Sequence, residues 1–418
     1  MTRSARQPIT KSAGRGAAAA PLLFDCFAIV SPGLETFALA EARVLGLPAV
    51  LEAGGGGIAW RGDLRSILLA NAGLRIASRV VVRLARFEAR SFAELERHAR
   101  QIPWSRFIGS GGAVRFRVTC KKSKLYHSDA VMQRLADAVV RALPGTRAGG
   151  ASADEDERPQ AAEFPHADER SEETPDTGAQ LFIVRMLRDE CTVSADSSGA
   201  LLHRRGYRLA TAKAPLRETL AAALIAASGW DLVSPLVDPL CGSGTIPIEA
   251  ALMGRGRAPG AARAFSAERW PGVARTLGDR IRAELVERER TGSPPSVVGS
   301  DRDAGAIAAA VANADRAGVS DDVGLAMRSL SAAEFPGGGH GWVVTNPPYG
   351  VRVGDTERVR DLWAQLGHVL RARAKGWRIA VLSPDPSLER QLGISVRAVA
   401  QTTNGGIPVR LVVGDVAS

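Results

Sequence analysis

The sequence has few cysteines, and their spacing suits neither a metal site nor a disulfide framework. Cys26, Cys120, Cys191 and Cys241 stand far apart, without a Cys-x-x-Cys motif and without paired histidines. Structural zinc sites and disulfide-rich folds both need such close pairs. The pattern therefore predicts no bound metal and no disulfide, and it favours a reducing compartment, the cytoplasm.

A second absence is that of an apolar run long enough to cross a membrane. The chain has 418 residues, of which 45% are hydrophobic and 23% charged, so we expect a globular protein with two or three domains and no membrane partner. Residues 1–21 are basic, rich in alanine and glycine, and contain no acid. Asp25 interrupts the apolar run that follows. This favours a disordered basic tail over a signal peptide, with an organellar transit peptide as the alternative.

Acidic residues are scarce relative to basic ones except in one segment. The formal net charge is +10, yet residues 151–178 hold ten acidic and two basic side chains, so the remainder carries +18. A surplus of this size, without a long basic amphipathic helix, favours a nucleic acid partner over a membrane surface. Residues 145–178 have almost no large apolar side chains, and we expect them to form a disordered acidic insertion.

The first half of the chain alternates short strands and helices. Residues 22–85 follow this pattern and predict an α+β region. Beyond it we expect a strand at Ala113–Thr119, a helix at Ser128–Ala142 and a hairpin of Gln180–Leu187 with Glu190–Asp196. The turn between that strand and that helix carries basic and aromatic side chains that suit phosphate contacts and base stacking: Lys121, Lys122, Lys124, Tyr126 and His127. A solvated entry to the helix explains this run about as well.

The sequence Asn346-Pro347-Pro348-Tyr349-Gly350 follows the apolar run 342–344. Such a run indicates a buried parallel strand, and open α/β sheets bind ligands beyond the carboxyl ends of their strands. The Asn346 side-chain oxygen and the Pro347 carbonyl can each accept one N–H of an exocyclic base amine. The prolines fix φ and hold these acceptors in place, while Tyr349 can stack on the base. The alternative is an ordinary proline turn.

A glycine turn follows another apolar strand, in Asp238-Pro239-Leu240-Cys241-Gly242-Ser243-Gly244-Thr245. Glycines at such a turn let the backbone approach a ligand closely. A dinucleotide-binding fingerprint needs a third glycine where Pro247 stands, and an acid about 20 residues on. Neither is present, and the next strand that ends in an acid is Val297–Asp301. The order of glycine turn, acid and NPPY is instead that of S-adenosylmethionine-dependent methyltransferases.

Seven segments carry a more specific resemblance. They are HRRGYR (203–208), APLRETLAAALI (214–225), DPLCGSGTIPIEAA (238–251), ERWP (268–271), GSDRD (299–303), NPPYG (346–350) and NGGIPVRL (404–411). From residue 22 onward, insertion excluded, the chain resembles the THUMP-domain RNA guanine-N2 methyltransferases, close to bacterial enzymes that act on 23S rRNA. NPPY and the glycine turn are widely shared, whereas HRRGYR with APLRETLAAALI is much more selective.

The resemblance implies a fold, a reaction and a set of roles. It makes 22–85 a ferredoxin-like region, 86–196 a THUMP domain and 197–418 a Rossmann-like α/β methyltransferase domain. The family's motifs imply cofactor contacts by Asp238, Pro239, Cys241, Gly242, Gly244, Thr245, Asp301, Arg302 and Asn346, and base contacts by Asn346, Pro347 and Tyr349. Where relatives place an acid for the adenine amine, this chain has Arg328-Ser329-Leu330, so that contact is left unassigned.

The sequence leaves several alternatives open. A tRNA guanine could be the substrate instead of 23S rRNA, and adenine-N6 methyltransferases use the same NPPY motif. A nonenzymatic RNA-binding THUMP protein is a further class, against which the intact DPLCGSGT and NPPY segments argue. Relatives that modify two ribosomal guanines carry a second methyltransferase domain, so for this chain we expect a single methylation.

Overall fold

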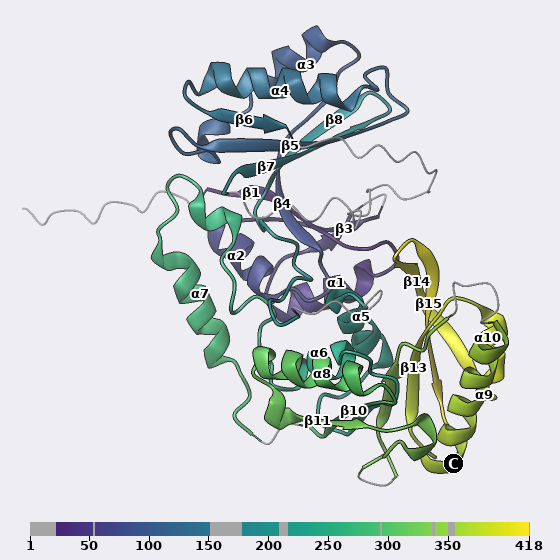
Figure 1. Cartoon of the computed structure of the whole chain (residues 1–418). Helices are drawn as coiled ribbons and strands as arrows, with labels where there is room; N and C mark the ends of the chain where they lie inside the picture. Colours follow the sequence, from purple (N-terminus) through teal and green to yellow (C-terminus); the bar gives the residue numbers. More distant parts are fainter. Residues whose placement is uncertain are drawn as a thin grey trace, which may run out of the picture.

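The computed structural model describes residues 22–52, 55–150, 178–208, 216–292, 295–336, 339–349 and 356–417. Two sheets organise these residues, one of eight strands in the order β2-β3-β1-β4-β8-β7-β5-β6 and one of seven in the order β11-β10-β9-β12-β13-β15-β14. Figure 1 shows the first sheet in the upper part of the molecule and the second in the lower part. The tail predicted at residues 1–21 lies outside the described residues.

The first part of the eight-stranded sheet is built from a strand-helix-strand pattern used twice. Its elements are β1 (Phe24–Ile29), α1 (Glu35–Val44), β2 (Val50–Leu51), β3 (Gly57–Gly62), α2 (Leu64–Gly73) and β4 (Arg79–Glu88). β1 pairs antiparallel with both β3 and β4. Asp63 starts α2, because its side chain accepts a hydrogen bond of 2.9 Å from the Ser66 backbone N–H. The strand order β2-β3-β1-β4, with antiparallel pairing and two connecting helices, confirms the ferredoxin-like fold of the N-terminal region.

β4 continues into the second part of the same sheet. This part comprises α3 (Phe92–Ala99), β5 (Ala113–Lys121), α4 (Ser128–Ala142), β6 (Arg147–Gly150), β7 (Gln180–Leu187) and β8 (Glu190–Asp196). β4 pairs with β1 from Arg79 to Arg83 and with β8 from Val81 to Glu88. The boundary expected at residues 85 and 86 therefore falls inside one strand. Figure 1 shows α3 and α4 together on one face of these strands.

Residues 145–150 correct the expected limits of the acidic insertion, since they belong to the fold. Arg147–Gly150 forms β6, which pairs in parallel with Ala113–Phe116 of β5, and Thr146 is buried. The segment lacks large apolar side chains, but backbone hydrogen bonds along a sheet edge do not require them. Residues 151–177, the rest of the predicted insertion, lie outside the described residues.

The seven-stranded sheet has the strand order of a doubly wound α/β domain. Its strands are β9 (Leu236–Asp238), β10 (Val297–Asp301), β11 (Val323–Met327), β12 (Trp342–Thr345), β13 (Arg378–Ser383), β14 (Val396–Asn404) and β15 (Ile407–Asp415). β9 to β13 are parallel, and β15 runs antiparallel to β13 and to β14. The Rossmann-like α/β fold expected from the sequence is confirmed.

Helices cover both faces of this sheet. They are α5 (Glu218–Ser228), α6 (Thr245–Gly254), α8 (Ala304–Ala317), α9 (Thr356–Arg373) and α10 (Pro386–Gln391). The helix α7 (Thr276–Glu287) packs instead against α2 of the ferredoxin-like region. Neighbouring strand residues point to opposite faces: Val344 packs in the cluster shared with α5 and α6, whereas Val343 packs with Trp363 of α9. Figure 1 shows α5, α6 and α8 together and α9 and α10 on the other side. Burial on both faces explains why these strands read as uninterrupted apolar runs.

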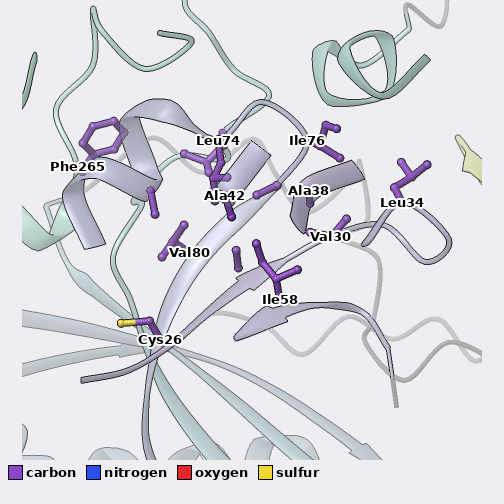
Figure 2. Packing of buried hydrophobic residues seen from close by; sticks show 14 of the residues in the cluster. Cys26, Val30, Leu34, Ala38, Ala42, Ile58, Leu74, Ile76, Val80 and Phe265 are labelled. Atoms are coloured by element: carbon purple, nitrogen blue, oxygen red, sulfur yellow. The ribbon is translucent and has the colours of Figure 1, made fainter. Parts of the chain in front are cut away.

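The two sheets are joined by a buried, largely apolar contact. Figure 2 shows Phe265, from the segment after α6, beside the apolar side chains of the ferredoxin-like region. Trp270 packs edge-on against Phe107 with ring centroids 4.9 Å apart, and its indole N–H donates a 2.7 Å hydrogen bond to Gln180 Oε1. Within the described ranges, no helix is both long and apolar enough to span a bilayer.

Candidate active site

Three polar side chains stand at the carboxyl ends of adjacent parallel strands. β9 lies between β10 and β12, with Gly299 paired to Asp238 and Val343 paired to Val237. Asp238 ends β9, Asp301 ends β10 and Asn346 directly follows β12. The strand order reverses between β9 and β12, which is where open α/β sheets bind their ligands. The structure thus brings these three predicted residues to one edge of the sheet.

The glycine turn between β9 and α6 takes a left-handed backbone conformation that residues other than glycine rarely adopt. Gly242 and Gly244 have φ angles of 51° and 83°. A Cβ on Gly244 would lie 2.9 Å from the Ala310 Cβ, so α8 closes over this residue. A Cβ on Gly242 would meet no atom within 4 Å, so that glycine faces open space. α6 then begins without a side-chain cap, and because Pro247 has no N–H, the N–H groups of Thr245 and Ile246 are the ones that could face a ligand's anionic group.

Two carboxylates flank this turn. Asp301 Oδ2 accepts a 3.0 Å hydrogen bond from the Gly242 N–H, which ties the turn to the end of β10. Asp238 is buried, and its Oδ1 accepts from the Leu240 N–H at 3.1 Å. Burial, with a smaller contribution from the charge of Asp301, raises the pKa of Asp238 to about 7. Because the described residues pair neither carboxylate with a basic side chain, the site suits a cationic ligand.

The Asn346 side chain has one acceptor without a partner. Its Oδ1 is buried and makes no hydrogen bond with the described part of the chain. Buried polar atoms are rarely left unpaired, and an exception at a strand end in a ligand-binding position points to a substrate donor. Pro347 beside it is buried, and the Pro348 carbonyl accepts a 3.4 Å hydrogen bond from the Trp363 indole N–H.

Tyr349 is held by a residue that sequence reasoning missed. Its hydroxyl accepts a 2.5 Å hydrogen bond from Asn404 Nδ2, at the end of β14, and its ring is half-buried between the two apolar clusters. Burial raises the pKa of this phenol. Asn404 begins the NGGIPVRL segment, so the signal was present in the sequence, but nothing local indicated its partner.

The remaining predicted cofactor residues divide into buried and exposed ones. Pro239, Cys241 and Thr245 are buried in the turn, and the Cys241 N–H donates a 3.0 Å hydrogen bond to the Ser300 carbonyl. The Cys241 thiol donates a weak 3.7 Å hydrogen bond to the Gly242 carbonyl, and burial raises its pKa well above the ordinary value. Arg302 is exposed, and the basic residue after β11, Arg328, pairs with Glu334.

The predicted RNA contacts lie on the other sheet. Lys121 is the last residue of β5, and Lys122 and Lys124 are in the turn that follows it. Tyr126 is 68% exposed beside His127, with ring centroids 4.0 Å apart. Asp189 anchors this turn, because its Oδ1 accepts a 2.7 Å hydrogen bond from the Lys124 N–H. Figure 1 places β5 in the upper part of the molecule and the seven-stranded sheet in the lower part. The structure thus does not bring these residues to the NPPY loop.

Comparison with known protein families agrees with this division. Residues 205–412 match a family model described as an RMKL-like methyltransferase domain, and residues 25–81 match one described as an RlmL ferredoxin-like domain. The ribosomal RNA large subunit methyltransferase K/L of Syntrophotalea carbinolica is 34% identical over 95% of this chain. The match covers 54% of that protein, so the chain spans about half the length of such relatives.

Two further relatives match over nearly their whole length. A Synechocystis sp. protein named "Putative RNA methyltransferase" is 31% identical over 92% of this chain and 95% of its own. The structure titled "a putative methyltransferase complexed with SAH" superposes with a TM-score of 0.78 at 29% identity, over 95% of this chain and 99% of that one. These matches extend the likeness from the catalytic domain to the N-terminal half.

Proposed function

The chain belongs to the RMKL-like methyltransferase family, and from this premise we propose that it methylates the exocyclic N2 amine of a guanine in RNA with S-adenosylmethionine (SAM). The K/L relatives are named for ribosomal RNA of the large subunit, which supports 23S rRNA as the first substrate to test and tRNA as the second. The SAH in the similar structure supports SAM as the methyl donor.

The glycine turn and its carboxylates would hold the cofactor. Gly242 leaves open space at the turn, and the uncapped start of α6 offers N–H groups to the cofactor's carboxylate. Asp238 would face the cationic methionine end. Asp301 would bind the ribose hydroxyls, since each carboxylate oxygen can accept a second hydrogen bond beside those from Gly242 and Asp303. When bound, SAM supplies an electrophilic methyl group on a sulfonium.

The unpaired Asn346 Oδ1 is the observation that carries the proposal. A guanine N2 amine would donate one N–H to this oxygen and the other to the Pro347 carbonyl, which directs the nitrogen lone pair away from both. Because the amine becomes positive as its new N–C bond forms, these preorganised dipoles stabilise the transition state more than the ground state. The methyl–sulfur bond would break as the N–C bond forms, leaving S-adenosylhomocysteine as a neutral thioether. The extra amine proton would then pass to solvent water, so a strong general base is not needed.

Recruitment of RNA would depend on the basic N-terminal half. The lysines after β5 and the Tyr126–His127 ring pair suit a phosphate grip and base stacking. Residues 86–196 would act as a THUMP domain. The target base must leave its stack to reach the NPPY loop, and stacking on Tyr349 would offset part of that cost. Four free cysteines support a cytoplasmic location.

The test is transfer of labelled methyl from SAM to RNA, followed by mass spectrometry of the nucleosides. We expect N2-methylguanosine to appear in 23S rRNA from a deletion strain, and to be absent when Asn346→Ala replaces the wild type. Formation of N6-methyladenosine would instead establish the adenine alternative, and methylation of tRNA alone would reassign the substrate. No transfer to any RNA by a protein that binds SAM would refute the proposed activity.

A further inference from the structure

Helix α8 contacts the glycine turn at two points. The Ala310 side chain closes over Gly244, and Asn313, which is fully buried, donates a 3.1 Å hydrogen bond from Nδ2 to the Ser243 carbonyl. Neither Ala310 nor Asn313 belongs to a sequence motif of the site. α8 therefore contacts the backbone of the turn at two successive residues, Ser243 and Gly244.

The same amide is fixed on its other side by Arg316, one turn further along α8. Arg316 Nη2 donates a 2.5 Å hydrogen bond to Asn313 Oδ1. Arginine only donates and a carbonyl only accepts, so the two neighbours together define which amide atom faces which partner. The second donor of Arg316, Nε, contacts the Tyr207 carbonyl at 2.6 Å. Arg316, acting through Asn313, thus joins the turn to the HRRGYR segment.

The HRRGYR segment is itself clamped between the two halves of the molecule. Arg205 Nη2 donates a 2.6 Å hydrogen bond to the Arg75 carbonyl, just after α2 of the ferredoxin-like region. The Tyr207 hydroxyl donates a 3.1 Å hydrogen bond to Glu249 of α6. Arg205, Tyr207 and Glu249 are all buried. A continuous series of contacts therefore runs from the ferredoxin-like region to the Ser243 carbonyl.

We propose that Asn313 and Arg316 are positioning residues for SAM, which hold the glycine turn in its binding conformation and link it to the segment between the two halves. The inference rests on the proposed function of the turn. Asn313 and Arg316 would not touch the cofactor. They would act by fixing the Ser243 carbonyl, and with it the Gly242 and Gly244 torsions that shape the binding face.

Arg316 offers the cleaner variant, because it is an exposed residue and its replacement leaves the core intact. We expect Arg316→Gln to weaken binding of S-adenosylhomocysteine several-fold. Asn313→Asp should weaken it on the order of tenfold. The aspartate keeps an acceptor for Arg316, but it replaces the donor to the Ser243 carbonyl by an oxygen that repels that carbonyl. Arg316→Lys should recover part of the affinity. The measurement is titration calorimetry of the full chain.

Arg257 supplies the matched control. Its Nη1 donates to the Ala317 and Gly318 carbonyls at 3.2 and 2.9 Å, so Arg257→Gln removes contacts from the end of the same helix without touching Asn313 or Tyr207. Arg257→Gln should bind S-adenosylhomocysteine like the wild type, although its melting temperature should fall by about as much as that of Arg316→Gln. Steady-state assays should show a raised KM for SAM with unchanged kcat in Arg316→Gln and Asn313→Asp, and an unchanged KM in Arg257→Gln.

Two results would overturn the inference, and they differ from failure of the proposed function. Equal affinity in Arg316→Gln, Asn313→Asp and wild type would show that the turn holds its shape without α8. Equal weakening in Arg257→Gln would show that the effect is general loss of stability. A wild-type protein that does not bind S-adenosylhomocysteine would instead refute the assignment of the turn itself, and the positioning role with it.

Discussion

Asn404 Nδ2 donates a 2.5 Å hydrogen bond to the Tyr349 hydroxyl, which fastens the NPPY loop to the hairpin of β14 and β15. The two residues lie far apart in the sequence and meet only through the antiparallel end of the sheet. The contact gives the Tyr349 hydroxyl a function in holding the ring, in addition to the stacking role of the ring itself.

Replacing either partner of this contact should have the same effect. We expect Tyr349→Phe and Asn404→Ala each to slow single-turnover methyl transfer several-fold, while the double variant is no slower than either, because both remove one hydrogen bond. Tyr349→Ala should be much slower, since it also removes stacking. Thr403→Ala, the neighbour on β14, is the control. Additive losses in the double variant would show that the hydroxyl does not act through Asn404.

Asn346 should affect the rate more than the affinity for the cofactor. Its Oδ1 is unpaired within the described part of the chain, so Asn346→Ala removes an interaction that forms only with the substrate amine and strengthens as the amine becomes positive. We expect transfer to slow on the order of 100- to 1000-fold, with S-adenosylhomocysteine affinity unchanged. Asn346→Asp keeps an acceptor oxygen and should be milder. Near wild-type transfer by a folded Asn346→Ala protein would show that NPPY is only a structural turn.

Asp301 and Asp303 give a paired test of cofactor binding. Asp301 accepts from the Gly242 N–H, whereas Asp303 caps α8 by accepting from the Gly305 and Ala306 N–H groups. We expect Asp301→Ala to weaken SAM binding by at least tenfold. Asp303→Ala should cost about 1 kcal/mol of stability, the usual value of an N-cap, and leave SAM affinity intact. Unchanged SAM affinity in Asp301→Ala, measured by calorimetry, would show that Asp301 does not bind the cofactor.

Asp238 should make both stability and SAM affinity depend on pH. Its folded pKa of about 7 lies above the unfolded value near 4, so its contribution to stability is fully present below about pH 4 and is lost as pH rises through 7. Asp238→Asn mimics the neutral form, and its melting temperature should exceed that of the wild type increasingly from pH 4 to 7, with the difference levelling off above pH 7. Glu41 and Glu218, whose pKa values burial also raises to about 7, are common to both proteins.

A bound cation favours the ionised form of Asp238, so SAM should bind more tightly as pH rises over the same range. Titrations in two buffers of different ionisation enthalpy should detect the proton released on binding. A pH-independent affinity in the wild type would place the cationic end of SAM away from Asp238.

The lysines after β5 should govern the salt dependence of RNA binding. Each of Lys121, Lys122 and Lys124 that grips a phosphate should contribute about 0.7 to 0.9 to the slope of log K against log salt, so its replacement by glutamine should lower the slope by that amount. Lys375→Gln, at an exposed position before β13, is the control. Filter binding with an rRNA fragment measures the slope. An unchanged slope in the triple variant would show that RNA binds elsewhere.

The sequence predicted the elements of the site because each is local. An apolar strand followed by a glycine turn, an acid or NPPY defines its own place at a sheet edge, and Asp238, Asp301 and Asn346 meet because parallel strands share that edge. Contacts between distant segments are not encoded in this way. Neither the Asn404–Tyr349 bond nor the contact of Arg316 with Tyr207 leaves a periodic or compositional trace.

The strand β6 shows a second limit. Arg147–Gly150 resembles disordered sequence, because composition measures how much apolar surface a segment can bury. Its order comes from backbone pairing with β5, which is set by the neighbouring strand. Likewise, the boundary expected at 85 and 86 followed a change in sequence pattern, whereas β4 continues through it as one strand.

The continuity of β4 has a geometric consequence for choosing a target. One strand runs through both parts of the eight-stranded sheet, and Trp270 and Phe265 pack that sheet against the methyltransferase domain, so we expect little change in the distance between the turn after β5 and the NPPY loop. With RNA bound at the turn after β5, the distance from that turn to the NPPY loop would determine which nucleotide reaches the active site. The nucleotide that is methylated would be the one at the right distance and angle from the RNA segment bound at the turn after β5. The local base sequence would then matter less than the shape of the folded RNA.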